Sequence, residues 1–257
     1  MKPAGIVRKW HHATALCLMI AGYCLQLHPA DTNKNGEHLP VEVIVENLQA
    51  ANLRRAETLC GYTGKRVYKV NYRGFPGGRH AEMTVEAAYT SPNQKDFRII
   101  SEGGSKLLLQ RVLHRLLDSE REALQNGNRE QTTMSPENYT FRFVTIEQGP
   151  EGKFYVLQVE PKIKNKFVYR GTIWVDTEDF AVTRIEGKPA KNPSWWISST
   201  EIHHRYSKID RFWLPAHNES VTHVRVGGEA VLTIEYTDYK IKTAAAAESV
   251  PSSSAEP

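Results

Sequence analysis

The sequence predicts a mainly β (α+β) fold: a strongly curved antiparallel sheet that forms a half-open β-barrel and is covered by two or more amphipathic helices. Three observations support this prediction. Roughly nine or ten segments alternate apolar and polar residues, short turn-forming stretches join most of them, and two further segments have apolar residues at helical spacing. A sheet of this size curves strongly, and the helices are the available cover for its concave side.

The clearest single element is a β-hairpin over residues 167–186. Five alternate residues of its first strand share one face: Phe167, Tyr169, Gly171, Ile173 and Val175. Residues 176–179 supply turn chemistry, and Phe180, Val182 and Arg184 are predicted to begin the return strand.

The N-terminal segment 1–30 has the three parts of an export signal. Basic Lys2, Arg8 and Lys9 precede an apolar run over 13–27, and the small residue Ala30 precedes a polar linker over 31–39. We expect cleavage near Ala30 and a periplasmic protein. An uncleaved membrane anchor is the alternative, because residues 28 and 29 make a poor cleavage site although the run is short for a spanning helix.

Removal of this segment changes the charge balance. The whole chain has 33 Lys and Arg against 29 Asp and Glu, and loss of the three N-terminal cations leaves 30 against 29. A nearly neutral protein lacks the basic face typical of nucleic-acid binding, so we expect no nucleic-acid partner. Two of the three cysteines, Cys17 and Cys24, lie in the signal, which leaves Cys60 to be a buried structural thiol.

Two amphipathic helices are predicted. The first spans 40–58, with Pro40 at its first position and Gly61 as its stop, and its apolar stripe is expected to pack on the core. The second follows Ser105, its predicted N-cap, and ends at Asn126 and Gly127. Its stripe consists of Leu109, Val112, Leu113, Leu116 and Leu117.

The strands alternate along the rest of the half-barrel domain, which we place at 40–242. They fall around 62–72, 81–89, 97–101, 139–143, 155–159, 195–206, 212–226 and 229–241, besides the hairpin. Gly227 and Gly228 are predicted to form a tight turn. The tail 243–257 has no periodicity and is expected to be disordered.

No catalytic motif is present, and we predict no enzymatic activity, no catalytic residues and no cofactor. His203 and His204 are adjacent in a strand and therefore point to opposite faces, so a metal site is not expected either. The run 103–106 lacks the full phosphate-loop pattern and is interpreted as a loop before the second helix.

Three hairpin motifs carry a family resemblance: GTIWVD at 171–176, VTRIE at 182–186, and FWLP at 212–215 before a long strand. They resemble the C-terminal half of outer membrane lipoprotein-sorting proteins, a group related to the periplasmic carrier LolA, its receptor LolB and the sensor domain of RseB. The resemblance covers most of 41–241. It implies a half-open barrel with helices over its mouth and an apolar cavity that holds acyl chains.

The aromatic residues of the predicted sheet suit either a lipid cavity or a filled core, and the resemblance favours the cavity. Ten residues are the predicted lining: Tyr68, Val70, Met83, Val85, Phe97, Ile99, Phe141, Leu157, Trp174 and Trp196. The predicted function is a periplasmic carrier or binding protein for the acyl chains of lipoproteins or lipids, with at most transient membrane contact. A sensor or scaffold for an envelope protein partner is the alternative, and an exported enzyme comes third.

Overall fold

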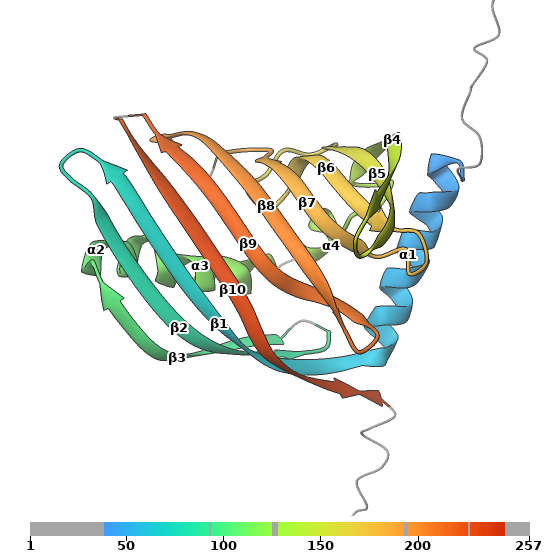
Figure 1. The fold of residues 1–257 in the computed structure, drawn as a ribbon, viewed down its shortest axis with the longest axis horizontal. Helices are drawn as coiled ribbons and strands as arrows, with labels where there is room; N and C mark the ends of the chain where they lie inside the picture. Colours follow the sequence, from blue (N-terminus) through green and yellow to red (C-terminus); the bar gives the residue numbers. More distant parts are fainter. Residues whose placement is uncertain (1–38, 93, 125–127, 193–194, 226, 245–257) are drawn as a thin grey trace, which may run out of the picture. The chain divides into compact units, whose positions relative to one another are not determined.

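A computed structural model describes residues 39–244 except 93, 125–127, 193–194 and 226, all within one compact unit that begins at His38. These residues form ten antiparallel strands in the order β3-β2-β1-β10-β9-β8-β7-β6-β5-β4 (Figure 1). The two edge strands, β3 and β4, do not pair with each other, so the curved sheet stays open. The predicted half-open antiparallel barrel is thereby confirmed.

The strands are β1 (Leu59–Gly74), β2 (Arg79–Thr90), β3 (Gln94–Gly104), β4 (Tyr139–Gly149), β5 (Gly152–Pro161), β6 (Tyr169–Asp176), β7 (Val182–Pro189), β8 (Ile197–Ile209), β9 (Phe212–Val224) and β10 (Gly228–Thr243). The first and last strands, β1 and β10, are neighbours in the middle of the sheet.

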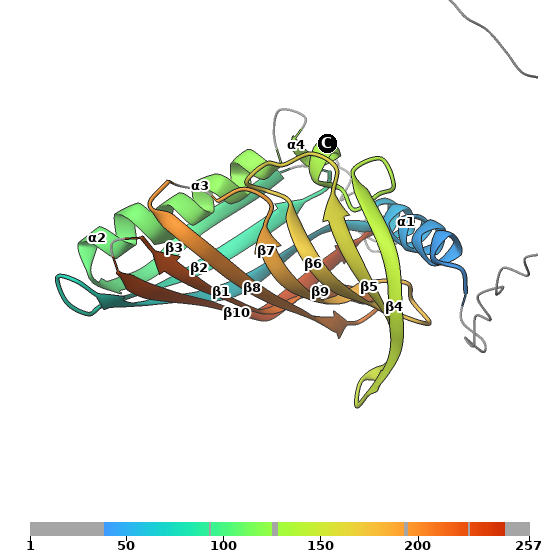
Figure 2. The same ribbon diagram turned by 90° about the horizontal axis from the view of Figure 1, so that it is seen from above.

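Helices cover the sheet at two places. Helix α1 (Val41–Thr58) packs beside β1 and β4, and a continuous helical segment packs over β1, β2 and β3. That segment comprises α2 (Lys106–Leu108), a π-helical turn η1 (Leu109–Leu113) and α3 (His114–Ala123) (Figure 2). A short helix that the sequence did not predict, α4 (Asn128–Thr132), follows. None of the described helices combines the length and apolar character needed to cross a bilayer.

Details at the helix ends differ from expectation. Pro40 is the N-cap of α1 rather than its first helical residue, and the Ser105 side chain makes no capping hydrogen bond. Gly61 does not stop a helix, because the chain passes from Thr58 directly into β1. Glycine is required there for another reason: a Cβ at position 61 would collide with the Tyr89 carbonyl oxygen of β2. The predicted stop at residues 126 and 127 lies outside the described residues.

The predicted hairpin of β6 and β7 is present, but Phe180 and Arg184 are placed differently from the prediction. Asp176 Oδ1 accepts the backbone N–H groups of Glu178 and Asp179 at 3.0 and 2.7 Å, which builds the turn. Phe180 has a left-handed backbone (φ 51°), so the return strand begins at Val182. A register shift beside Trp174 then places Arg184 against the Trp174 ring, 3.5 Å from its centroid.

Two further predictions are corrected. The strand expected from residue 195 begins at Ile197, because Trp195 and Trp196 lie in a turn. Cys60 is half-buried on β1 and is not a core residue. Strand β10 extends to Thr243, one residue into the predicted tail. The predicted signal and all but residue 39 of the predicted linker lie outside the described part of the chain, as does the tail beyond residue 244.

Candidate functional site

The concave face carries two apolar clusters, one under each helical cover. The α3 core joins side chains of β1, β2 and β10 to the helical segment: Tyr68, Val70, Ala81, Met83, Val85, Leu108, Leu109, Leu113, Leu117 and Ile234. The α1 core joins α1 to β4–β7: Ile44, Val45, Leu48, Tyr139, Tyr155, Leu157, Val159, Val168, Ile173, Val175 and Ile185. All of these side chains are buried.

The strand register continues these clusters across the sheet, because paired residues of antiparallel strands present their side chains on one face. One row of partners runs from Tyr68 to Ile234, Asn218, His204, Ile185, Ile173 and Leu157. Only its middle members, on β9 and β8, are polar. Along this row, the middle of the concave face is therefore polar, with an apolar cluster on either side.

We call Thr200, His204, Asn218 and Thr222 the polar strip. The two threonine hydroxyls are hydrogen-bonded at 3.1 Å, and Asn218 Nδ2 donates to the Tyr236 hydroxyl at 2.7 Å. Asn218 Oδ1 is buried and has no hydrogen-bond partner among the described residues. A buried acceptor without a partner destabilises a fully packed core. Its presence here favours a surface that receives a further polar group.

His204 shows how recessed the strip is. Burial, with a contribution from the neighbouring His203, lowers the pKa of His204 to about 4. The imidazole is therefore neutral near pH 7, with one donor and one acceptor nitrogen. Its ring lies against Tyr169 with a centroid separation of 6.4 Å. Burial also raises the pKa of Tyr169 well above its ordinary value, so this hydroxyl stays protonated.

A cleft opens beside the strip, between the C-terminal half of α1 and the adjoining ends of β6–β9. Its volume is about 530 Å³, and we call it the α1 cleft. Apolar side chains supply much of its wall: Ala51, Met134, Tyr169, Ala181, Val182, Ile185, Tyr206, Phe212 and Trp213. Arg54, Arg55 and Arg211 also border it. The carboxylate of Asp179, a further lining residue, forms an ion pair with Lys208 at 2.6 Å and accepts a hydrogen bond from Trp213 Nε1 at 2.7 Å.

An ion-pair network fastens α3 to the sheet. Arg66 is 3% exposed on the concave face of β1 and lies 2.9 Å from Glu120 of α3, which Lys95 of β3 also contacts at 3.0 Å. The Arg66 guanidinium lies over the rings of Phe97 and Tyr236, 5.3 and 5.0 Å from their centroids. Burial opposes ionisation of Glu120, but Lys95 and Arg66 outweigh it and lower its pKa to about 2.

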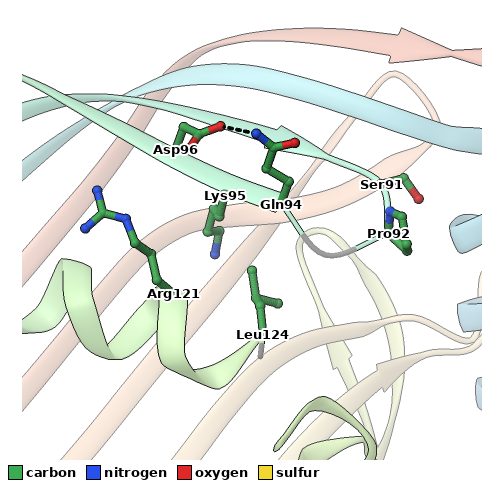
Figure 3. A pocket seen from close by; sticks show the side chains of 7 residues that line it. All are labelled: Ser91, Pro92, Gln94, Lys95, Asp96, Arg121 and Leu124. Atoms are coloured by element: carbon green, nitrogen blue, oxygen red, sulfur yellow. Dashed lines mark hydrogen bonds between the residues drawn. The ribbon is translucent and has the colours of Figure 1, made fainter. Parts of the chain in front are cut away.

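A second cleft, of about 440 Å³, lies where the β2–β3 turn faces the end of α3 (Figure 3). Its walls are mainly polar: Gln94 donates to Asp96 at 2.9 Å, and Lys95 is already paired with Glu120. Pro92 and Leu124 are its apolar lining residues. The α1 cleft has nine apolar lining residues and therefore offers more apolar surface to an acyl chain.

The ten predicted lining residues lie in different parts of the structure. Five belong to or pack against the α3 core (Tyr68, Val70, Met83, Val85 and Phe97), and two belong to or pack against the α1 core (Phe141 and Leu157). Trp174 lies on the opposite face of the sheet with Phe154 and Val156, while Ile99 on the edge strand and Trp196 in a turn are exposed. These ten side chains therefore do not surround one space.

Sequence reasoning missed Arg66, Asn218 and the α1 cleft. A signal for Arg66 was present, because it shares the alternation of Tyr62, Tyr68 and Val70 and so had to face inward. No signal marked Asn218, whose inward direction follows from its pairing with Ile234. Within the described residues, no three His, Cys, Asp or Glu side chains are grouped to hold a metal ion.

No family model and no curated protein sequence matches this chain. Solved structures do match: an outer membrane lipoprotein-sorting protein domain from Vibrio parahaemolyticus (12% identity, TM-score 0.40) and a DUF1329 family protein from Desulfovibrio piger (16%, 0.40). A LolA superfamily protein from Nitrosomonas europaea also matches (11%, 0.32). Each match covers 80% of this chain and 94% of the other.

These are structures to which the chain is similar. At these identities and TM-scores, the similarity identifies neither a ligand nor a partner of this chain.

Proposed function

We propose that this chain is a carrier or binding protein of the cell envelope that holds an acyl chain of a lipoprotein or lipid on its concave face. The observation that carries the proposal is the α1 cleft. Its volume of about 530 Å³ falls within the roughly 300–1,000 Å³ typical of small-molecule sites. Its wall combines apolar and polar groups, and the arginines beside it suit the polar or anionic end of an amphiphile.

The polar strip would bind the polar group that links the acyl chain to its cargo. Ile185 lines the cleft and is the strand partner of His204, so the strip adjoins the cleft. An amide N–H would satisfy the free acceptor Asn218 Oδ1. A few fixed polar groups in an apolar site are the usual means of orienting a ligand.

The residues predicted to line the cavity under α3 remain part of this proposal in a different role. Leu109, Leu113 and Leu117 fill the space against Tyr68 and Met83. An acyl chain reaches these residues only after α3 has moved away from the sheet, as carriers that bind and release a cargo require. The α1 cleft therefore provides the first binding position. Trp174, Ile99 and Trp196 are not part of the proposed site.

The placement in the envelope rests on the predicted export signal at 1–30, and the proposed activity requires binding alone, without catalysis. Apolar burial provides the driving force at about 0.8 kcal/mol per buried CH₂. The ordering of the acyl chain opposes it.

The test is displacement of a fluorescent fatty-acid probe by an acylated peptide, measured with the full chain. Ala51→Trp fills the cleft from α1 and is expected to weaken binding about tenfold. Leu53→Trp adds the same ring on the exposed side of the same helix and is the matched control, with affinity unchanged. Both variants should melt like the wild type. If the folded wild type shows no saturable displacement, the carrier proposal is wrong and a scaffold for a protein partner replaces it.

A further inference from the structure

Four loops meet along one end of the sheet. They are the β1–β2 turn, the β3–α2 junction, the β7–β8 loop and the β9–β10 turn (Figure 1). The Tyr72 hydroxyl donates to the Phe75 carbonyl at 2.8 Å and approaches the Gly227 carbonyl at 3.4 Å, which joins the first and last of these loops. The Arg225 N–H donates to the Trp196 carbonyl at 2.9 Å, and the Ser105 N–H donates to the His80 carbonyl at 2.8 Å.

These loops and the adjoining start of α2 carry large apolar side chains that are exposed to solvent. Phe75 and Trp195 are each 82% exposed, and Leu107 and Trp196 are also exposed. Isolated surface apolar residues need no explanation, but four of them on adjoining segments do. Trp195 is held in place, because its carbonyl accepts a hydrogen bond from Arg225 Nε at 2.6 Å. We call the four residues the aromatic rim.

Basic side chains lie close to the rim in the chain. Arg73, Arg79, Lys106, Lys191 and Arg225 are all exposed on the same loops or at their ends. None of the five has a carboxylate within ion-pairing distance among the described residues. Glu229, at the start of β10, is the strand partner of Arg73 and lies 3.9 Å from His223.

We propose that the aromatic rim is a docking surface for an anionic phospholipid bilayer. Trp and Phe side chains at protruding tips insert at the headgroup level, where an amphipathic ring is favoured. The five cations supply attraction to anionic lipid, and together the two signals give reversible rather than permanent attachment.

The geometry favours a bilayer over a protein segment. The rim consists of side chains from separate turns and from the start of α2, and its residues line neither of the two clefts described above. Its charge complements a continuous anionic surface. The rim is also independent of the proposed acyl site, because the α1 cleft lies at the other end of β8 and β9, beside Arg211 and Phe212.

The experiment uses the full chain and vesicles of phosphatidylglycerol mixed with brominated phosphatidylcholine, which quenches tryptophan on contact. The wild type should be quenched more strongly than Trp195→Phe/Trp196→Phe, because any contribution from the other tryptophans is common to both proteins and cancels in the difference. Vesicles without phosphatidylglycerol should remove that difference, as should salt well above about 150 mM.

Two matched charge reversals locate the contact. Arg73→Glu/Arg79→Glu, at the rim, should weaken vesicle binding about tenfold or more. Lys240→Glu/Lys242→Glu makes the same change in net charge at the opposite end of β10. This variant should change vesicle binding less than about twofold. Equal quenching of wild type and Trp195→Phe/Trp196→Phe overturns the proposal, as does equal weakening by both reversals. Self-association that Trp195→Ala/Trp196→Ala abolishes in sedimentation overturns it in favour of a contact between two copies of the chain.

Discussion

At the scale of single residues, the loss of Glu120 should destabilise the fold strongly. Glu120 is 27% exposed, and it neutralises Arg66, which is almost fully buried under α3. A buried guanidinium without its partner is far more costly than a broken surface ion pair. The network therefore couples the position of α3 to the charge on one carboxylate.

Glu120→Gln should lower the free energy of unfolding by about 3 kcal/mol. Asp118→Asn on the same helix removes an exposed pair with Arg121 and should cost less than about 0.5 kcal/mol. Urea unfolding of both variants near pH 7 measures the difference. Equal, small losses would show that Arg66 does not depend on Glu120.

The pH dependence of the same pair follows from its pKa. The pKa of Glu120 is lowered from 4.5 to about 2 on folding, so the unfolded chain binds the proton more tightly. This contribution is therefore fully present above about pH 5 and is lost as the pH falls towards 2; its size is about 3 kcal/mol. The wild type should lose its stability advantage over Glu120→Gln across this window.

At the scale of elements, the β6–β7 hairpin depends on a close approach of two glycines. Gly171 and Gly187 are strand partners, and a Cβ at position 171 would collide with the Glu186 carbonyl oxygen. This contact brings the two strands together beside the α1 core. The GTIWVD motif thus begins with a glycine that the pairing itself requires.

Gly171→Ala should lower the free energy of unfolding by about 3 kcal/mol, because neither backbone can yield without breaking the pairing. Gly103→Ala on the edge strand β3 is the control, since a Cβ there meets no atom within 4 Å. Thermal melts of the two variants provide the comparison. A Gly171→Ala midpoint no lower than that of Gly103→Ala would contradict the prediction.

At the scale of the whole molecule, β10 joins two parts of the sheet. It lies between β1 and β9, so β1–β3 on one side and β4–β9 on the other share no strand pairing without it. Its pairing with β1 extends from Gly74 and Gly228 to Leu59 and Thr243. The last strand of the chain therefore completes the fold.

A chain that ends at residue 227 should lose cooperative unfolding, since the remaining strands form two separate sheets with an exposed edge on each. A chain that ends at residue 244 retains every described strand and should unfold in one transition. Urea titration followed by circular dichroism and tryptophan fluorescence distinguishes the two. A single sharp transition in the shorter chain would show that one part folds alone.

The sequence by itself determined most of the strands, their antiparallel arrangement and the two longer helical segments. Alternation is a local property: it placed Tyr68, Val70, Met83 and Val85 in the interior. It separates the two faces of a strand without deciding which one turns inward, and Trp174, predicted to line the cavity, lies on the face opposite the α1 core. The turn at 176–179 could also be predicted from the sequence, because an aspartate side chain accepts hydrogen bonds from nearby backbone N–H groups.

Only the tertiary structure decided which strands are neighbours and which loops share an end of the sheet. The pairing of β1 with β10 joins residues at opposite ends of the chain, and no local pattern encodes it. The pairing of β10 with β9 places Asn218 in the polar strip. The pairing of β1 with β10 brings Phe75 to the same rim as Trp195 and Trp196. A register shift of one residue reverses the face of a side chain, as beside Trp174, so the site follows from the register of the whole sheet.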